Sequence, residues 1–484
     1  MQIQSIHFHA RTKDKLADAN LQRSLSRLSD KFVGARAKVI RELDDFEATR
    51  SAAVDIRRQV IEHLDVWLEM FEEKAAAVGT TVLYARDAQE ANDWVVRIAK
   101  RHSVNTVVKS KSMVTEEIGL NRALEKQGIR VRETDLGEYI LQINDNEPPS
   151  HIIAPVVHKN KEEISDLFAR VHGTEPKTDI QELTHEARER LRPEFLQADM
   201  GVSGGNFIIA DTGSVALVTN EGNEGMCTVN PRVHVAITGI EKVVPTLDDF
   251  ATLLRLLPRS ATGQSISNYV SLLTGPKREG DLDGPEHMYI VLVDAGRTGL
   301  MGGDFEEMLR CIRCGACMNH CPVYQKIGGQ AYGWVYPGPM GSVLTPSYAG
   351  LEQAPDLPHA ATLCGQCQVV CPVKIPLPDL LRKLREQQVD RGMRPFKERA
   401  GLWMWGQLAR RPWLYRSAVR VGVRLMAWLG RRQGGRISQL PLASGWTEGR
   451  DFPAPTGESF QAIYRARQLK ATVAAHSDTN SGPR

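Results

Sequence analysis

Seven of the eight cysteines lie between residues 311 and 371, in two groups with short and regular spacing. The first group follows the pattern C-x2-C-x2-C-x3-C-P, and the second follows C-x2-C-x3-C-P. The groups are Cys311, Cys314, Cys317 and Cys321 before Pro322, and Cys364, Cys367 and Cys371 before Pro372. Thiolates at this spacing wrap a [4Fe–4S] cluster, so the chain is predicted to bind iron–sulfur clusters. A structural zinc site or disulfides would use the same residue type and are the alternatives.

In a two-cluster module, the fourth cysteine of such a run ligates the neighbouring cluster. The predicted ligands are Cys311, Cys314, Cys317 and Cys371 for cluster 1, and Cys321, Cys364 and Cys367 for cluster 2. A complete second group would have a cysteine at position 361, where the chain has Ala361. Cluster 2 is therefore either [3Fe–4S], or [4Fe–4S] with a non-cysteine ligand or an exposed iron. Asp356 and His359 lie nearby, but contact with solvent explains each of them better.

The seven cysteines also allow a single four-cysteine cluster with a zinc-like remainder. A 42-residue insert, 322–363, separates the two groups and is rich in glycine, proline and aromatic residues. Long irregular loops of this kind are often functional. The insert is expected to present exposed aromatic side chains to a redox partner, to shield the clusters from water, or to do both. Neither group carries a flavin or nicotinamide motif, so the predicted chemistry is one-electron relay.

Segments that follow predicted strands form a second candidate site. Residues 109–112 lie between a strand and a helix, a position that suits an anion. Residues 201–223 are rich in glycine, which lets backbone amides approach a ligand, but they match neither the Walker A nor the G-x-G-x-x-G pattern. The predicted binding residues, for an unidentified ligand, are Lys109, Lys111, Gly204, Gly205, Thr212 and Gly213. Helix capping, solvated lysines and tight turns explain these residues about equally well.

Several acids and histidines have side chains suited to acid–base chemistry. Glu133, Asp135 and Glu138 lie together near a strand end, whereas the histidines at 151, 158 and 234 are scattered. No Ser-His-Asp order, H-E-x-x-H motif or nucleophile elbow is visible, so structural roles are favoured and no catalytic residue is predicted. Cys227 is expected to be a buried thiol. Residues 258–263 form a polar loop with a weak indication of binding.

The candidate binding residues lie in a predicted α/β domain, residues 79–297, where short apolar runs alternate with helical patterns. This alternation predicts a largely parallel, covered sheet, whose ligands usually lie beyond the carboxyl ends of the strands. Strands are expected over 80–85, 105–110, 130–136, 151–157, 207–211, 214–220, 234–240 and 288–294, and helices over 87–102 and 113–127. Residues 1–78 are expected to form a helical region, with one apolar stripe between Val60 and Phe71.

The bulk properties are those of an ordinary protein of several domains. The chain has 484 residues, a formal net charge of +3, 42% hydrophobic and 25% charged residues. Its N-terminus lacks the apolar segment of a secretory signal, and no run approaches 18 apolar residues. Together with cysteines at cluster spacing, these features predict a cytoplasmic protein whose membrane contact, if any, is peripheral.

The cluster domain is expected over 298–392 and is followed by a basic, Trp-rich helical region, 393–470. Residues 391–436 hold twelve Lys and Arg against one acid, and five of the eight tryptophans lie within 403–446. On a helix, Arg416, Arg420 and Arg424 form a stripe roughly opposite an apolar face. Such a helix suits an anionic membrane surface or an acidic partner, with packing on the cluster domain as the alternative. No nucleic-acid motif is present, so no nucleic-acid partner is predicted. The tail, 471–484, is predicted to be disordered.

The chain resembles the lactate-utilisation protein B family over nearly its whole length. The segments that carry the resemblance include KSKSMVTEEIGLNRALEKQGI, GVSGGNFIIADTGSVALVTNEGN, CIRCGACMNHCPVY and LCGQCQVVCPVKIPL. The resemblance implies a multidomain α/β plus α fold, in which a LUD-type α/β domain precedes an α-helical, ferredoxin-like domain with two [4Fe–4S] clusters. It further implies that the LUD domain is similar to the sugar-isomerase and CoA-transferase-like superfamily. The family shares the seven-cysteine pattern, so Ala361 is not a departure from it.

The resemblance implies an iron–sulfur electron-transfer subunit in the oxidation of L-lactate to pyruvate. Such a subunit relays electrons without being the catalyst, and its expected partners are A-type and C-type lactate-utilisation subunits and an unidentified electron acceptor. The alternative function makes the LUD domain itself an enzyme on a CoA-linked or phosphorylated substrate. A third hypothesis is a peripheral adaptor that contacts the inner face of a membrane through residues 391–436.

Overall fold

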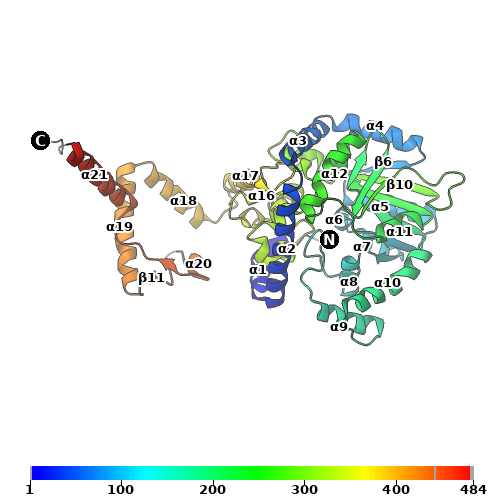
Figure 1. The fold of residues 1–484 in the computed structure, drawn as a ribbon, viewed down its shortest axis with the longest axis horizontal. Coiled ribbons are helices and arrows are strands. Elements are labelled where there is room, and N and C mark those ends of the chain that lie inside the picture. The colour runs from blue at the N-terminus through cyan, green and yellow to red at the C-terminus, as the bar shows by residue number, and fades with distance from the viewer. Residues whose placement is uncertain (1–2, 441–442, 480–484) are drawn as a thin grey trace. The chain divides into compact units, whose positions relative to one another are not determined.

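The computed structural model describes residues 3–440 and 443–479. The chain forms two compact units, within residues 1–388 and 389–484, and each is described by itself. In the first unit, an α/β part built on a parallel sheet adjoins a smaller, mainly helical part that carries the clustered cysteines (Figure 1). No helix among the described residues is long and apolar enough to cross a membrane.

The α/β part is built on a six-stranded parallel sheet with the order β1-β10-β7-β4-β2-β3. The strands are β1 (Thr81–Ala85), β2 (Thr106–Lys109), β3 (Arg130–Glu133), β4 (Met200–Ser203), β7 (Val233–Gly239) and β10 (His287–Val293). In the register, Val107 of β2 pairs with Val131 of β3 and with Met200 of β4. Strand β7 is buried along its whole length, as a central strand covered on both faces must be. The predicted α/β class with a largely parallel sheet is confirmed.

Helices on one face of the sheet are α5 (Ala88–Arg101), α6 (Met113–Ile118) and α7 (Leu120–Glu125). They bury Val95, Ile98 and Leu120 against the valines of the strands. The other face is covered at one end by α8 (Leu136–Ile143), α9 (Lys161–His172), α10 (Ile180–Gln197) and α11 (Asn223–Val229). Capping residues help to start such helices. At the start of α5, for example, the Asp87 side chain accepts a hydrogen bond from the Glu90 amide.

A second, four-stranded sheet covers the rest of that face, in the order β8-β5-β6-β9. Its strands are β5 (Phe207–Ile209), β6 (Ser214–Thr219), β8 (Val243–Val244) and β9 (Tyr269–Leu273). Helix α4 (Leu64–Ala77) packs Phe71 and Ala75 into the same apolar cluster. Helix α12 (Leu247–Ala261) packs on strands β5 and β8, and the Thr246 hydroxyl caps its start.

The direction of chain progression reverses between β2 and β4. From β2 the chain continues outward to β3, and from β4 it continues the other way to β7 and β10. Ligands of open parallel sheets usually bind at such a switch point, outside the carboxyl ends of the strands. The segments that follow β2 and β4, which start at Ser110 and Gly204, therefore lie at the expected binding position.

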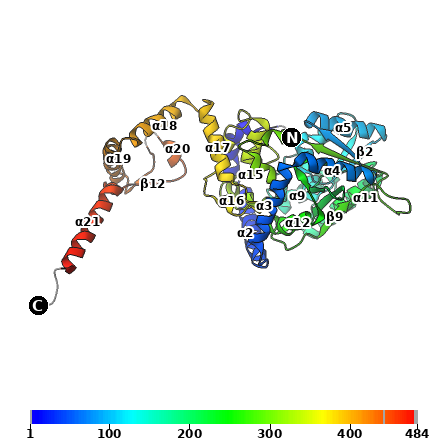
Figure 2. The same cartoon turned by 90° about the horizontal axis from the view of Figure 1, so that it is seen from above.

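The N-terminal region is helical, as predicted. It contains a 3-10 turn (Ser5–His7), α1 (Phe8–Ala17), α2 (Ala19–Arg41) and α3 (Phe46–Glu62), followed by α4. Helices α2 and α3 lie beside the cysteine-bearing part in both views (Figures 1 and 2). They are joined to it by hydrogen bonds from Arg36 and Arg50, so these helices belong to the surroundings of the cysteines.

Short helices alternate with loops in the cysteine-bearing part. Its elements are a 3-10 turn (Glu306–Arg310), α13 (Ala316–Asn319), α14 (Tyr324–Ile327), α15 (Gly338–Ala349), α16 (Gln366–Val369) and α17 (Leu377–Asp390), with further 3-10 turns at Gln330–Tyr332 and Leu357–His359. Helix α17 is the element that follows the second cysteine group.

The second unit consists of α18 (Phe396–Ala409), α19 (Pro412–Arg431), β11 (Arg436–Ile437), α20 (Ser444–Thr447), β12 (Phe452–Pro453) and α21 (Phe460–Thr479). Strands β11 and β12 form a small antiparallel pair that packs on α19. Helix α21 runs through residues 471–479, where the sequence predicted a disordered tail, and residues 480–484 lie outside the described part.

Three local predictions were wrong. Residues 151–157 form turns rather than a strand, because Pro155 interrupts the apolar run. The expected helix 113–127 is divided at Gly119 into α6 and α7. Residues 258–263 belong largely to the end of α12 rather than to a loop. Strand β4 was missed because its sequence, Met-Gly-Val-Ser, resembles a glycine-rich turn.

Candidate metal centre

The two cysteine groups follow the same backbone path. Before the second cysteine of the first group, Arg313 has a φ of 57°, and Gly315 after it has a φ of 76°. The second group repeats this with Leu363 at 54° and Gly365 at 84°. A short helix follows each glycine, α13 in one group and α16 in the other. Left-handed backbone at non-glycine residues is uncommon and concentrates at binding sites, so the repeat marks two equivalent ligand loops.

Interactions between the seven thiols follow the two predicted ligand sets in part. Thiol set 1 is Cys311, Cys314, Cys317 and Cys371, and thiol set 2 is Cys321, Cys364 and Cys367. Burial raises the pKa of Cys314 to about 12, and the charges of Cys371 and Cys311 raise it further. Burial likewise raises the pKa of Cys367 to about 12, with Cys321 and Cys364 as the next causes. Most of these interactions lie within a predicted set, although the charge of Cys367 in set 2 also raises the pKa of Cys317 in set 1.

Backbone amides point at the sulfur atoms. The amide of Arg313 donates to Cys311 Sγ at 3.5 Å, and the amide of Ile375 donates to Cys371 Sγ at 3.4 Å. Backbone hydrogen bonds from Gln366 and a side-chain hydrogen bond from Thr362 lower the pKa of Cys364. Donors of this kind stabilise thiolates and are among the features that set the reduction potential of an iron–sulfur cluster.

The two thiol sets differ in exposure. In set 1, Cys314, Cys317 and Cys371 are buried and Cys311 is half-buried. In set 2, Cys364 is exposed and Cys367 is half-buried. A hollow opens beside set 2 and is lined by its three cysteines together with Pro322, Pro339, Ala361, Thr362, Leu363, Gln366, Pro378 and Leu381. This hollow provides space between the thiols of set 2.

Seven thiols in two sets, with amide donors directed at the sulfurs, form a donor set that fits two iron–sulfur clusters. Among the described residues, no group of three His, Cys, Asp or Glu side chains converges on a single metal ion. The two candidate non-cysteine ligands are engaged elsewhere. His359 Nε2 is 2.9 Å from Gln388 Oε1, and Asp356 is 3.4 Å from His9 Nε2. Neither of them lines the hollow.

Buried arginines from the N-terminal helices surround set 1, a feature that the sequence analysis missed. Arg50 of α3 donates to the carbonyl oxygen of Cys371 at 2.6 Å, and Arg36 of α2 donates to the carbonyl oxygen of Val370 at 2.8 Å. Arg57 is fully buried and donates to the carbonyl oxygens of Val243 and Leu309. Nothing in the polar helical pattern of residues 36–57 distinguishes these arginines from solvated ones.

Two more basic side chains lie where set 1 meets the α/β part, Lys242 from the α/β part and Arg313 from the first cysteine group itself. Lys242 Nζ donates to the carbonyl oxygen of Cys311 at 3.1 Å. Arg313 lies over the ring of Tyr336 and 3.5 Å from Glu241. Glu241 is also paired with the buried Arg297 at 2.7 Å. The interface between the α/β part and the cysteine-bearing part is therefore a network of buried, paired charges rather than an apolar seam.

The insert between the cysteine groups buries its aromatic side chains. Tyr324, Tyr332, Trp334 and Tyr336 are all at most 7% exposed. The Tyr324 hydroxyl donates to the carbonyl oxygen of Ser150, which ties the insert to the α/β part. An exposed aromatic docking face was therefore the wrong expectation, and the alternative of a shield around the cysteines describes the insert.

At the switch point of the sheet, two of the predicted binding segments meet. A Cβ on Gly204 would lie 3.1 Å from the Ser112 side chain. Lys111 Nζ donates to the carbonyl oxygen of Ile153 at 2.8 Å and lies 3.4 Å from Asp135. Lys109 is buried, and it pairs with Glu133 at 2.9 Å and with Glu116 at 3.1 Å. Both lysine ammonium groups are therefore paired with carboxylates of the protein itself.

The other glycines of segment 201–223 are explained by close packing. A Cβ on Gly205 would lie 3.1 Å from Thr238, and one on Gly213 would lie 2.3 Å from the backbone nitrogen of Ala75 in α4. Gly213 and Thr212 form the turn between β5 and β6, away from the segment that follows β2. The fold thus brings Lys109, Lys111, Gly204 and Gly205 into one neighbourhood and separates Thr212 and Gly213 from it.

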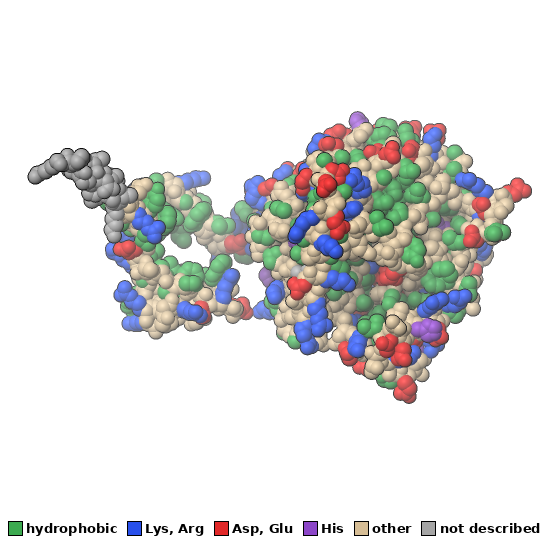
Figure 3. Space-filling model, in the orientation of Figure 1, with side chains coloured by type: hydrophobic (Ala, Val, Ile, Leu, Met, Phe, Trp, Pro, Cys, Tyr) green, Lys and Arg blue, Asp and Glu red, His purple; other side chains and the backbone are tan. Residues whose placement is uncertain are grey.

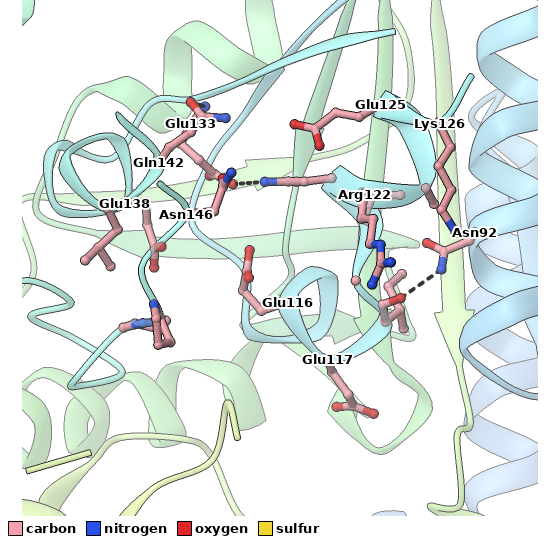
Figure 4. Close-up of a pocket in the computed structure, with 18 of the residues that line it drawn as sticks. Asn92, Glu116, Glu117, Arg122, Glu125, Lys126, Glu133, Glu138, Gln142 and Asn146 are labelled. Atoms are coloured by element: carbon pink, nitrogen blue, oxygen red, sulfur yellow. Dashed lines mark hydrogen bonds between the residues drawn. The ribbon is translucent and has the colours of Figure 1, made fainter. Parts of the chain in front are cut away.

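A cavity of about 1020 Å³ opens beside α6, α7 and α8. Its acidic lining residues are Asp93, Glu116, Glu117, Glu125, Glu133, Glu138 and Glu147, against Arg11, Arg122 and Lys126. Figure 4 shows Glu116, Glu133 and Glu138 around the same open space. Burial, with the charges of Glu116 and Glu133 as further causes, raises the pKa of Glu138 to about 8. The sequence analysis identified Glu133 and Glu138 but not the cavity.

The remaining candidate residues, Cys227 and three histidines, make contacts that suit structural roles. Cys227 is fully buried, as predicted, and burial raises its pKa to about 12. His234 Nε2 is 2.9 Å from Ser203 Oγ, and His151 Nε2 is 2.8 Å from Asn319 Oδ1. His158 is 2.9 Å from Glu147. The Ser203 hydroxyl at the end of β4 and the His234 ring are both at most 1% exposed, so their hydrogen bond lies in the interior of the protein.

Three family descriptions match successive parts of the chain. Residues 68–293 match "LUD domain", residues 307–375 match "4Fe-4S dicluster domain", and residues 381–469 match "Lactate utilisation protein B, C-terminal". A crystal structure of a duf162 family protein from Deinococcus radiodurans matches 48% of this chain and 98% of its own chain. The sequence identity is 15% and the TM-score is 0.28.

Curated relatives match over nearly the full length. A protein of Lysinibacillus sphaericus is 45% identical over 462 residues, which cover 95% of this chain and 97% of the relative. One of Geobacillus kaustophilus is 43% identical over 470 residues, which cover 97% and 98%. Both relatives are named lactate utilization protein B. Identity of this degree across the LUD part, the cysteine-bearing part and the C-terminal unit shows that the chain belongs to the lactate utilization protein B family.

Proposed function

We propose that this chain is an iron–sulfur electron-transfer subunit in the oxidation of L-lactate to pyruvate. The observation that carries the proposal is the pair of thiol sets, held by one fold whose whole length matches proteins named for lactate utilisation. Oxidation of lactate to pyruvate releases two electrons and two protons. Two clusters, when bound, supply one-electron carriers, so together they accept the electron pair of one turnover.

The residues of the chain position and insulate these carriers. Thiol set 1 holds cluster 1 and thiol set 2 holds cluster 2. The buried aromatics of the insert exclude water, and Arg36 and Arg50 place positive charge on the carbonyl groups beside set 1. Set 2 is the more exposed of the two, so cluster 2 is the exchange point with an external redox partner.

Anaerobic purification of the full chain tests the cluster content. We expect iron and sulfide at about two clusters per chain, and EPR signals of reduced iron–sulfur clusters after treatment with dithionite. Stoichiometric zinc without iron would overturn the proposal. A second arm measures lactate-dependent reduction of an artificial acceptor by the chain alone and with its A-type and C-type partners. Activity that requires the partners, with reduction of this chain's clusters by lactate, is the expected result.

The alternative function, an enzyme on a CoA-linked or phosphorylated substrate, rests on a similarity between the LUD domain and the sugar-isomerase and CoA-transferase-like superfamily. The cavity of the α/β part is lined by seven acidic side chains against three basic ones, and Glu138 is the one whose raised pKa keeps it protonated. Lysines 109 and 111 are already paired with acids. A phosphate group would be repelled by this lining, so the electron-transfer function is the better supported of the two.

A further inference from the structure

The backbone repeat assigns a structural equivalent to every cysteine of the two ligand loops except one. Arg313 and Gly315 correspond to Leu363 and Gly365 in position and in backbone conformation. Counting back by the same spacing, Cys311 of the first loop corresponds to Ala361 of the second. The first loop thus supplies a thiol at the position where the second supplies a methyl group.

No side chain of the surroundings replaces the missing thiol. The hollow beside set 2 is lined by Ala361 itself, proline, leucine, and only two polar side chains besides the cysteines, Thr362 and Gln366. The Thr362 hydroxyl is bonded to Cys364. Gln366 is exposed and amides are weak ligands for iron, so neither is a good fourth ligand.

The segment that contains Ala361 is also held in place. Arg385 of α17 donates from Nε to the carbonyl oxygen of Pro358 at 2.8 Å and from its terminal nitrogen to that of Ala361 at 3.0 Å. His359, within the same stretch, is bonded to Gln388. Bringing His359 or Asp356 to the hollow would break these contacts, so a rearrangement that supplies a protein ligand is disfavoured.

Solvent reaches this corner through the residues that follow Ala361. Thr362, Leu363 and Cys364 are all exposed. By contrast, the carbonyl of Cys311 is covered by Lys242, and its sulfur accepts from the amide of Arg313. The two predicted clusters therefore differ at one iron each. In cluster 1 the thiolate of Cys311 binds this iron, whereas in cluster 2 the equivalent iron faces water.

We propose that the corner of cluster 2 facing Ala361 takes its fourth ligand from solution, as an exchangeable small oxygen donor, either water or hydroxide or a small carboxylate. The inference rests on the proposed cluster content of set 2. Three thiolates hold three of the four irons, and the fourth iron keeps an open coordination position. That iron is consequently the one lost first: with ferricyanide as the electron acceptor, [4Fe–4S]²⁺ releases Fe²⁺ and one electron and leaves [3Fe–4S]⁺.

The first experiment titrates the anaerobic full chain with ferricyanide and follows the [3Fe–4S]⁺ EPR signal. Wild-type protein is expected to form about one three-iron cluster per chain, and added Fe²⁺ with a reductant should restore the starting spectrum. In A361C, which supplies the missing thiol, the signal should fall at least tenfold at the same oxidant dose. The control is Q353C, which adds a thiol at an exposed position of the insert outside the hollow and should behave as wild type.

The outcomes separate this inference from the proposed function. Equal three-iron signals in A361C and wild type, or a wild-type protein that keeps eight irons and forms no such signal, would overturn the open corner while leaving two clusters in place. A preparation without iron would overturn the proposed function itself. Because A361C must also assemble, its iron content is measured first, and the comparison uses the signal per eight irons.

A second experiment identifies the ligand class in reduced protein. Broadening of the cluster 2 EPR lines in water enriched in ¹⁷O identifies bound water or hydroxide, and a change in line shape on addition of sodium acetate identifies a carboxylate. Both effects should be absent in A361C and present in Q353C. If wild-type protein shows neither effect, cluster 2 has no exchangeable oxygen ligand and the proposal fails.

Discussion

Individual charged residues distinguish the two thiol sets. Arg36, Arg50, Arg57 and Lys242 direct their donors at carbonyl groups in or beside the loops of set 1. For set 2, the pKa values of the thiols are shifted by burial, by the charges of the other thiols of the set, and by hydrogen bonds. Positive charge near a cluster favours its reduced form, since reduction adds one negative charge. Cluster 1 is therefore expected to have the higher reduction potential.

Arg50 offers a direct test of this difference. Substitution Arg50→Gln removes the positive charge beside Cys371 and should move the midpoint potential of cluster 1 to a more negative value, as measured by EPR-monitored redox titration. Arg50→Lys keeps the charge and should restore most of the shift. The potential of cluster 2 serves as the internal reference. Equal midpoints for both variants and wild type would show that the arginine acts only on packing.

Glu138 is the second residue whose charge has a measurable consequence. Its raised pKa means that the folded protein holds a proton, between pH 4.5 and about 8, that the unfolded chain has released. Stability from this group is therefore fully present below pH 4.5 and is lost as the pH rises toward 8, at up to about 1.4 kcal/mol per pH unit. The charged groups that face it are Glu116, Glu133, Lys111 and Lys109.

Substitution Glu138→Gln should flatten this dependence. We expect the variant to gain stability relative to wild type as the pH rises from 5 to 8, measured by urea denaturation of the cluster-loaded protein. Glu125→Gln, an exposed residue on the same cavity, is the matched control and should follow wild type. A wild-type-like slope for Glu138→Gln would contradict the buried, protonated carboxyl.

Among the elements, the turn between β5 and β6 shows how packing explains a motif that resembles a binding loop. Gly213 has a φ of 65°, and a Cβ there would lie 2.3 Å from the backbone of α4. Gly213→Ala should therefore cost several kcal/mol of stability, measured as a lower denaturation midpoint. Gly225→Ala in α11, where a Cβ would meet nothing within 4 Å, should be neutral or stabilising. Unchanged stability of Gly213→Ala would reopen a ligand role for this turn.

At the scale of the whole molecule, the second unit differs from the first in its surface. Large apolar side chains are exposed along α18 and α19, among them Trp403, Trp405, Trp413 and Trp428. On the face drawn in Figure 3, hydrophobic and basic side chains lie side by side on this unit. Arg416, Arg420 and Arg424 are exposed as well. A basic surface with exposed tryptophans suits the headgroup region of an anionic membrane, so we retain peripheral membrane contact as a proposal.

Vesicle binding tests this proposal on the full chain. The triple variant Arg416→Gln, Arg420→Gln and Arg424→Gln should bind vesicles of phosphatidylserine and phosphatidylcholine about 100-fold more weakly than wild type, at about 1 kcal/mol per arginine. The control neutralises three exposed arginines of the first unit, Arg58, Arg86 and Arg101, and should bind as wild type. Binding equal to that of wild type by the triple variant would indicate that the surface serves another partner.

Much of this molecule could be predicted from local patterns. The spacing of the cysteines implied the ligand loops and the gap at Ala361, and alternating apolar runs implied the parallel sheet. Cys227 was expected to be buried and is. These features depend on residues close together in the chain, where spacing and periodicity translate directly into local geometry.

Other features depended on contacts between distant segments, which only the tertiary structure decided. The arginines of α2 and α3 look like solvated residues until the fold places them on the loops of set 1, more than 300 residues away. Burial of the insert aromatics, pairing of Lys109 with Glu133, and packing of Gly213 on α4 are of the same kind. Sequence determined which residues can bind a cluster, whereas the surroundings that would tune each cluster arise from long-range packing that no local pattern encodes.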